Sequence, residues 1–573
     1  MAAVVGLAVG VPVAGAMASG AFDIPRVDDW AYAHAAVDLE RTLHVHLVGW
    51  GEMMLVGHLL WGVPFAALFG GSISVMHWAG ATAAALGLLI TYLLARQFLS
   101  QGRALLVTAV IGALPAFAFL SATYMTDLTS YLAEVGCLLA GIAALRAGGR
   151  RRAAWLFGLS LLIGFWGFTV RESAIAAPVA VLGGHLVRAL RRPGRARTIT
   201  TAAVLGAGIG LAGAAVAAYA WRHSLPNDQR LQSPPGAFDR FKALAAELNG
   251  YFTLSLSVAP LLLVGARERV SRVRGSRAGT AAALAVGVAG LAALLVTHYP
   301  ARTSFTVLLG GGLMKPGPAL AGARQDLFSA PAWAALNVIA VLAGAAVAGV
   351  LVAAAAPTLR AVRIRPGPVG QAIRHALCPG RPALAGLAPS LVVLLGYGAA
   401  SALLLIFRTL GGHGLFDRYF LGLALVLSIL LLRRGGGGRP PPERGRSLAI
   451  AGLALVPLAL VSWLVILDSD AFDVARWSAA LRAQRAGVPP EQIGAGFEWL
   501  GAHLNGRPPT TSIISPYGRC VLLTGGRLPG PRLELLETPT YAPVDHVLQR
   551  RIWVYRDARV CARVAAAPGP SAG

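Results

Sequence analysis

Residues 77–95 have the sequence HWAGATAAALGLLITYLLA, which contains no charged side chain, and the next eight residues, RQFLSQGR, contain two arginines. A helix over such a run is about 28 Å long, close to the roughly 30 Å hydrocarbon core of a membrane. Apolar runs of similar length recur along the whole chain. They predict about thirteen transmembrane helices, at residues 1–19, 77–95, 104–121, 129–146, 153–170, 174–189, 199–221, 250–265, 280–297, 332–355, 386–407, 416–432 and 447–467.

The composition indicates the same class of protein. Of the 573 residues, 56% are hydrophobic and 13% are charged, whereas soluble domains carry about 25% charged residues. A soluble fold of this length could not bury so much apolar surface. We therefore predict an α-helical polytopic protein of the cell membrane.

Basic residues give the chain a formal net charge of +25. A nucleic-acid-binding protein would gather them on one face or tail, but here about half of them lie in short loops that contain only two acids, Glu268 and Glu443. By the positive-inside rule these loops are cytoplasmic, and the intervening loops and the C-terminal tail are outside. Nucleic acid is therefore not an expected partner. The basic loops are 96–103, 146–152, 188–197, 267–277, 360–381 and 433–446.

The membrane domain is predicted to cover residues 1–467, with a first outer loop at 20–70. We interpret 51–69 as a helix in the outer interface, because a full span there would invert every later loop; a true span with a mis-assigned neighbour is the alternative. Residues 1–19 are either retained or cleaved as a signal peptide after Ala16-Met17-Ala18. Both cases leave the first loop outside.

Residues 468–573 predict a small extracytoplasmic α+β domain, with a helix at 474–487 and strands near 512–523 and 546–555. Cys520 and Cys561 in this tail either form a disulfide or remain two buried thiols. Its aromatic residues either stack on sugar rings or pack a core. They are Trp477, Trp499, Trp553, Tyr517, Tyr541 and Tyr555.

Adjacent carboxylates, Asp28 and Asp29, stand near the start of the first outer loop. Such a pair repels, which raises one pKa and leaves the other group ionised as a base. A helix N-cap followed by an acidic first turn is the alternative.

A second acidic group follows at Asp127, with Glu134 on the same helical face seven residues later. Thr126 or Asp127 could simply cap this helix. A glutamate within a span, however, normally faces a polar cavity or a partner. We therefore expect a hydrated acidic cleft that opens outward.

Arg171 and Arg418 stand at the outer ends of two different spans, and Tyr419 is the residue after Arg418. A guanidinium group binds phosphate through a planar fork of donors. Snorkelling anchors, or an ion pair between Asp417 and Arg418, are the alternatives. The sequence contains no Walker A, HExxH or CxxC motif, so nothing supports nucleotide-driven transport or zinc proteolysis.

The order of these motifs resembles the GT-C superfamily of glycosyltransferases, specifically the family 39 branch related to protein O-mannosyltransferases and the lipid A aminoarabinose transferase. VDDWAYA at 27–33 is similar to the acidic pair and aromatic helix of that family, and GWGE at 49–52 to its interfacial helix. MTD at 125–127 matches its second acidic motif. TVRE at 169–172 stands where relatives place a basic residue for the donor phosphate, and RYFL at 418–421 resembles their Arg-Tyr-Leu-Leu motif.

The resemblance implies a membrane glycosyltransferase that moves a hexosyl or pentosyl group from a polyprenyl-phosphate donor to a glycan, lipid or protein acceptor outside the cytoplasm. It implies three catalytic carboxylates, a donor-phosphate site and a divalent metal ion. The implied residues are Asp28, Asp29 and Asp127 for catalysis, Arg171, Arg418 and Tyr419 for the phosphate, and Asp28 with Glu52 for the metal.

Two departures leave the metal and the donor open. The acidic pair is Asp-Asp where relatives often have Asp-Glu, and residues 171–172 are Arg-Glu where relatives have Lys-Gly. The alternative function is a transporter or flippase for a lipid-linked or anionic solute, which also needs many spans and intramembrane charges. The hydropathy shows no inverted repeat that would favour it.

Overall fold

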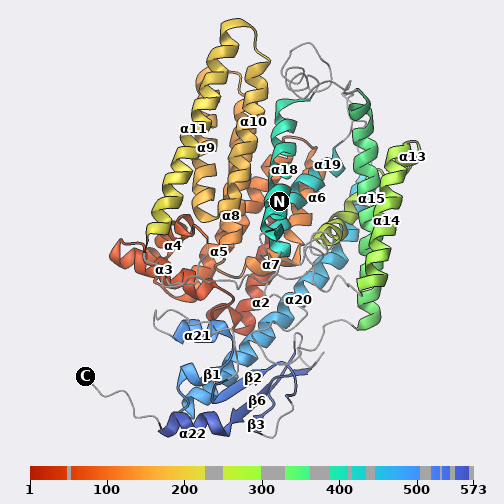
Figure 1. The fold of residues 1–573 in the computed structure, drawn as a ribbon. Coiled ribbons are helices and arrows are strands. Elements are labelled where there is room, and N and C mark those ends of the chain that lie inside the picture. Colours follow the sequence, from red (N-terminus) through yellow and green to blue (C-terminus); the bar gives the residue numbers. More distant parts are fainter. Residues whose placement is uncertain are drawn as a thin grey trace.

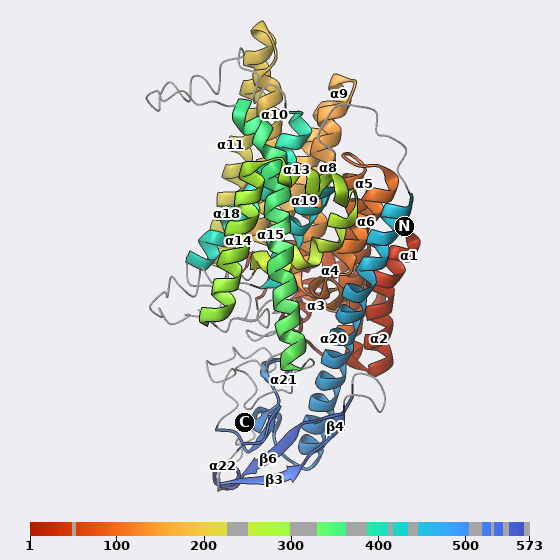
Figure 2. The same cartoon turned by 90° about the vertical axis from the view of Figure 1, so that its right-hand side faces the viewer.

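The computed structural model describes residues 1–47, 53–225, 250–297, 329–361, 387–410, 416–433, 445–503, 518–528, 532–542 and 549–566. These residues form a bundle of long helices with a small sheet at one end (Figure 1). Helix α20 (Gly445–Arg485) joins the two parts, and Figure 2 shows it continuing from the bundle to the sheet. The predicted domain boundary at 467/468 therefore falls inside one continuous helix.

Among the described residues, ten helices are long and apolar enough to cross a membrane, or eleven if one bent pair counts as a span. The chain is therefore a polytopic α-helical membrane protein, as predicted. The ten are Ala2–Ser19, α5 (Ile73–Ala95), α8 (Thr126–Arg146), α9 (Arg150–Val170), α10 (Ala176–Leu190) with its preceding turn η3 (Glu172–Ile175), α11 (Gly194–Ser224), α14 (Arg277–Thr297), α15 (Ala330–Ala361), α18 (Pro389–Leu410) and α20.

Three predicted spans differ from single long helices. Residues 104–121 form α6 (Gln101–Gly112) and α7 (Pro115–Leu120), because the residue before Pro115 takes an extended conformation. Residues 250–265 end in a 3-10 turn, η4 (Ala259–Leu263), and the chain bends by 112° into α13 (Ala266–Arg274). Residues 416–432 divide into a turn, η6 (Asp417–Phe420), and the short α19 (Leu421–Leu432).

The first outer loop contains two helices, α3 (Asp29–Thr42) and α4 (Val56–Phe69). The 14 residues of α4 reach about 21 Å, too short to cross a hydrocarbon core, which favours the interfacial interpretation. Both helices lie toward the sheet end of the bundle, whereas the turn between α10 and α11 lies at the far end (Figures 1 and 2). The first loop and the tail thus share one end of the molecule.

The buried helix α8 packs against α5, α9 and α10. Gly80 of α5 allows a close approach, since a Cβ atom there would lie 2.0 Å from the carbonyl oxygen of Thr123. This contact fixes the segment that leads into α8. It thereby positions Asp127 in the first turn of that helix.

The tail contains a four-stranded sheet in the order β1-β2-β6-β3, with β1 and β2 parallel and the other pairs antiparallel. Cys520 and Cys561 form a disulfide that ties the chain before β2 to α22, which confirms the predicted bridge. The elements are β1 (Ile493–Gly494), α21 (Phe497–His503), β2 (Val521–Thr524), β3 (Leu533–Glu537), β4 (Thr540–Tyr541) paired with β5 (Arg550–Arg551), β6 (Trp553–Asp557) and α22 (Ala558–Ala566).

The aromatic residues of the tail pack mainly into its core. Trp499 is fully buried and contacts both Trp477 and His503. Tyr541 and Tyr555 are also buried. Tyr517 lies outside the described residues. The geometry of the described aromatic residues supports core packing rather than a sugar-stacking surface.

Candidate active site

Asp28 stands at the start of α3, directly after a residue with a strained backbone. Val27 has φ of +56°, a conformation that a β-branched side chain rarely adopts. The backbone N–H of Arg26 donates to Asp29 Oδ1 at 2.6 Å, which holds the turn. Asp28 occupies the N-cap position, but its side chain makes no capping hydrogen bond to α3. The capping interpretation therefore does not explain this carboxylate.

Asp28 is half-buried and faces the next turn of its own helix, where Tyr32 Oη donates to Asp28 Oδ2 at 3.5 Å. Burial, together with Asp28, raises the pKa of Tyr32 far above its ordinary value, while Arg171 and Arg418 act to lower it. Tyr32 therefore stays a neutral hydroxyl. It hydrogen-bonds to Asp28 and interacts electrostatically with Arg171 and Arg418, the two arginines that the sequence assigns to the donor phosphate.

Asp29 points elsewhere. It is fully buried, and its Oδ2 lies 2.8 Å from His77 Nε2. His77 Nδ1 lies 2.9 Å from the carbonyl oxygen of Phe22 and must donate to it, because a carbonyl only accepts. Both ring nitrogens thus face oxygen atoms, an arrangement that suits an imidazolium paired with a carboxylate. The structure places Asp29 in a supporting ion pair, away from the site around Asp28.

Asp127 joins the two predicted phosphate-binding arginines. Its Oδ1 forms an ion pair with Arg171 Nη1, and Arg418 Nε lies 3.5 Å from the same oxygen. The three side chains are nearly buried, at 3%, 12% and 9% exposure for Asp127, Arg171 and Arg418. Arg418 also interacts electrostatically with Asp28. Residues far apart in the sequence therefore form one charged cluster.

Tyr419 is the centre of that cluster. The guanidinium carbons of Arg171 and Arg418 lie 5.0 Å and 5.4 Å from the centre of its ring. A third guanidinium, that of Arg408, lies 4.7 Å from the same ring. Sequence reasoning missed Arg408, which stands one residue beyond the predicted span 386–407. Its only signal was a cation at the same end of the bundle as Arg171 and Arg418.

Glu134 continues the polar surface of α8 toward the middle of the bundle. It accepts hydrogen bonds from Tyr397 Oη and, at 3.0 Å, from Ser130 Oγ. Protein hydroxyl groups therefore satisfy this carboxyl. The hydrated acidic cleft expected from the sequence stays a prediction.

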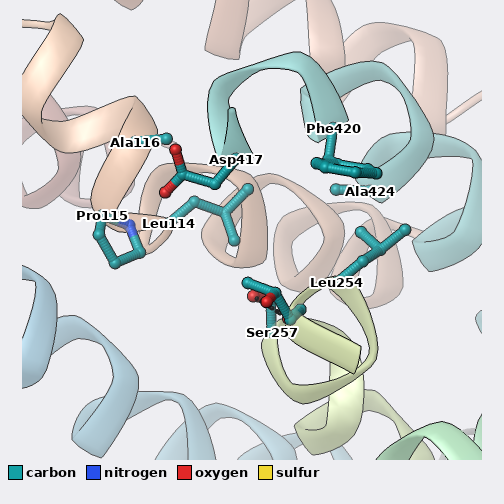
Figure 3. A pocket seen from close by; sticks show the side chains of 9 residues that line it. Leu114, Pro115, Ala116, Leu254, Ser257, Asp417, Phe420 and Ala424 are labelled. Carbon is teal, nitrogen blue, oxygen red and sulfur yellow. Dashed lines mark hydrogen bonds between the residues drawn. The ribbon is translucent and has the colours of Figure 1, made fainter. Parts of the chain in front are cut away.

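A small cavity lies behind Asp417, the residue before Arg418. It offers about 20 Å³ to the centre of a water molecule, room for roughly one water. The carboxyl of Asp417 enters from one side and Ser257 from the other (Figure 3). Most of the lining is apolar, from Leu114, Pro115, Ala116, Leu254, Phe420 and Ala424. The cavity is too small for a sugar.

The predicted metal site cannot be assembled from the described residues. Glu52, the expected partner of Asp28, lies outside them. Within the described ranges, no three His, Cys, Asp or Glu side chains gather as ligands for a metal ion. The metal stays a prediction, and no catalytic step below depends on it.

Sequence reasoning also missed a buried network between the first loop and the tail. Arg26 Nη1 lies 2.7 Å from Asp470 and Arg26 Nε lies 3.1 Å from Asp473, both on α20. Arg476 continues the network to Asp473 at 3.1 Å and to Glu498 of α21 at 2.8 Å. We call these five residues the junction network. It fixes the turn that carries Asp28 to the helix that enters the tail.

Helix α21 packs directly on α3. A Cβ atom at Gly501 would lie 2.3 Å from the ring of Trp30, so only glycine permits this approach. Trp30 itself is buried. The tail therefore covers one side of the helix that begins at Asp28 and Asp29.

No family model and no curated protein matches this sequence. Among solved structures, the chain is similar to ArnT from Cupriavidus metallidurans bound to undecaprenyl phosphate, with a TM-score of 0.37, 12% identity and 98% coverage of both chains. It is also similar to the archaeal oligosaccharyltransferase AglB from Archaeoglobus fulgidus in complex with an inhibitory peptide and a dolichol-phosphate, with a TM-score of 0.36, 16% identity and coverage of 88% of this chain and 60% of that one.

Proposed function

We propose that this protein is a membrane glycosyltransferase that takes a hexosyl or pentosyl group from a polyprenyl-phosphate donor. The observation that carries the proposal is the buried cluster of Arg171, Arg418 and Asp127 around Tyr419, which interacts electrostatically with Asp28. A carboxylate that can accept a proton and guanidinium groups that can bind a phosphate are the two functions that such a transfer needs. The acceptor is a hydroxyl of a glycan, lipid or protein.

In the proposed reaction, an acceptor hydroxyl attacks the anomeric carbon of the donor sugar. Its proton passes to Asp28 as the new carbon–oxygen bond forms. The bond between the anomeric carbon and the phosphate oxygen breaks, and its electron pair stays on that oxygen. The phosphodiester monoanion thus becomes a monoester dianion. Arg171 and Arg418 stabilise this growing charge, in a site where burial strengthens electrostatic interactions.

Asp127 has a positioning role in this proposal. Two guanidinium groups buried without an anion would be costly, and Asp127 supplies the negative charge that keeps Arg171 and Arg418 together. An incoming phosphate would share these guanidinium groups with Asp127. We therefore assign the proton transfer to Asp28 rather than to Asp127.

We also propose that the site and the tail are extracytoplasmic, because the basic loops predict the opposite ends of the spans to be inside. Alkaline phosphatase fused after Gly487, beyond the end of α20, should be active in cells, and fused after Pro193, between α10 and α11, it should be inactive. Fluorescent-protein fusions at the same points serve as the converse control. Activity at Pro193 and not at Gly487 would place the site in the cytoplasm.

The function is tested by sugar transfer from synthetic polyprenyl-phosphate sugars with purified protein. Arg171→Lys and Arg418→Lys should each raise the donor KM about 10-fold, because lysine keeps the charge but loses the bidentate contact. Arg195→Lys, at an exposed position in the first turn of α11, is the matched control and should match wild type. Unchanged donor KM in both variants would leave the two arginines as membrane anchors, and lipid-sugar translocation without transfer would favour the transporter alternative.

A further inference from the structure

Two buried hydroxyl groups at the candidate site make weak hydrogen bonds. Tyr32 Oη donates to Asp28 Oδ2 at 3.5 Å and lies 3.8 Å from Met53 Sδ, and Thr126 Oγ1 donates to the same sulfur at 3.3 Å. Hydrogen bonds between oxygens are usually about 2.7 Å long, and a thioether is a weak acceptor. Both hydroxyl residues are fully buried, where such groups normally have strong partners. They would therefore gain from a better partner than this sulfur.

The sulfur belongs to a short segment that is fixed next to Arg171. The backbone N–H of Met54 donates to the carboxyl of Glu172, and that of Leu55 donates to the carbonyl oxygen of Val170 at 3.2 Å. These two acceptors belong to the residues directly before and after Arg171. The segment is therefore attached on both sides of the arginine that we assign to the donor phosphate.

Leu55 in this segment has a strained backbone. Its φ of +61° and ψ of −32° lie outside the regions that L-residues ordinarily adopt. Such a conformation persists only where the surrounding structure enforces it, and examples cluster at functional sites. Here the enforced conformation goes with the position of Met53, two residues earlier, against Tyr32 and Thr126.

The donor sugar in the proposed reaction has to lie beside these hydroxyl groups. Its anomeric carbon is joined to the phosphate that Arg171 and Arg418 would bind, and the hydroxyl that attacks this carbon gives its proton to Asp28. Tyr32 interacts electrostatically with all three of these residues, and Thr126 shares its sulfur contact. The hydroxyl groups of a sugar both donate and accept hydrogen bonds through oxygen, so they are better partners than a thioether.

We propose that Tyr32 and Thr126 bind hydroxyl groups of the donor sugar, and that the Met53 side chain stands where this sugar binds. The inference rests on the proposed function and adds the residues that recognise the sugar part of the donor. Methionine is unbranched and flexible, so its side chain can move aside while the backbone of the segment stays in place. The arginines then bind the lipid phosphate, and the two hydroxyl groups select the sugar attached to it.

The test compares the binding of two probes to the purified full-length protein in detergent: farnesyl phosphate, and farnesyl phosphate linked to a sugar. The sugar is whichever of glucose, mannose, galactose and arabinose the wild type binds most tightly. We expect Tyr32→Phe and Thr126→Val each to weaken binding of the linked sugar about 3- to 10-fold, the effect of losing one hydrogen bond, and to bind farnesyl phosphate like wild type. Thr126→Ser keeps the hydroxyl and should retain wild-type binding. Met53→Ala should tighten binding of the linked sugar, because the sugar then displaces no side chain.

Thr42→Val, at an exposed position in the last turn of α3, is the matched control and should bind both probes like wild type. Size-exclusion profiles show whether each variant is folded, and the Thr126 and Met53 variants still test the inference if Tyr32→Phe is not. Equal weakening of both probes, or wild-type binding of the linked sugar by both hydroxyl variants, would overturn the inference. Weaker farnesyl phosphate binding by Arg171→Lys would in that case still support the proposed function. Weaker binding of the linked sugar by Met53→Ala would overturn the place given to Met53, and wild-type protein that binds neither probe would overturn both proposals.

Discussion

Asp28→Asn is expected to give a folded, membrane-inserted protein whose turnover is lower by about 10²- to 10⁴-fold, the usual contribution of a general base. Asparagine has nearly the shape of aspartate but cannot accept the proton of the acceptor hydroxyl. Turnover with a saturating lipid-phosphate sugar, measured together with thermal unfolding in detergent, checks both parts of the expectation.

Asparagine is the discriminating substitution because it caps helices about as well as aspartate. If Asp28 served only to start α3, the variant would keep nearly full turnover. The structure already argues against that role, since the Asp28 side chain makes no capping hydrogen bond within the described helix. Loss of turnover with unchanged stability would therefore assign the carboxylate to the chemistry.

Two neighbouring carboxylates provide controls for this experiment. Asp23 belongs to the same loop but is exposed and accepts a hydrogen bond from Ser74 Oγ at 2.6 Å, so Asp23→Asn should match wild type. Asp29→Asn removes the charge that pairs with His77 and should lower thermal stability. Near wild-type turnover of the Asp28→Asn protein, with the Asp29 variant inactive but folded, would move the base to Asp29.

The membrane architecture could be predicted because length and hydropathy are properties of continuous segments. The breaks within it were harder to predict. Pro115 and Pro260 are visible in the sequence, but proline in a membrane helix is often tolerated with only a kink. The helices that pack around a proline decide whether its own helix kinks or breaks, and the sequence does not show which helices these are. The continuity of α20 was also hard to predict. Its sequence changes from apolar to polar near residue 467, which looked like a domain boundary.

The members of the site could be predicted in part, but not their pairing. Arg171 and Arg418 were found as cations at the outer ends of spans, yet nothing in the sequence indicated that both would contact Asp127. The sequence also suggested that Asp28 and Asp29 act as a pair, because they are neighbours. At the start of a helix, however, successive side chains point about 100° apart. The side chain of Asp28 therefore hydrogen-bonds to Tyr32, whereas that of Asp29 pairs with His77.

The junction network could not be found from spacing. Arg26 is a single arginine between a proline and a valine, and its partners Asp470 and Asp473 lie at the other end of the chain. The signal that could have indicated it is compositional: three acids, Asp468, Asp470 and Asp473, follow directly on an apolar run, and buried acids require cations nearby. The apolar run of α20 ends where these acids begin, so they were assigned to the tail.

Arg26→Met is expected to lower the free energy of unfolding by about 3–5 kcal/mol, the usual effect of removing one partner from a buried ion pair. Arg26 is 1% exposed and Asp470 is 0% exposed, so the variant would leave the carboxylate of Asp470 buried without its guanidinium. Asp473 keeps Arg476 as a partner and should contribute less to the loss. Denaturant unfolding in detergent micelles measures the change.

The double variant Arg26→Met with Asp470→Asn identifies the cause. With both charges removed, no ion is left buried alone, so most of the lost stability should return even though the ion pair is absent. Arg41→Met, at an exposed position in the last turn of α3, is the control for losing an arginine from the same loop. The double variant should also recover turnover, because Asp28 depends on the fold of this turn and not on the charge of Arg26. A double variant as unstable as Arg26→Met would show that the turn needs the guanidinium itself, through its contacts with Ser469 and the ring of Phe119.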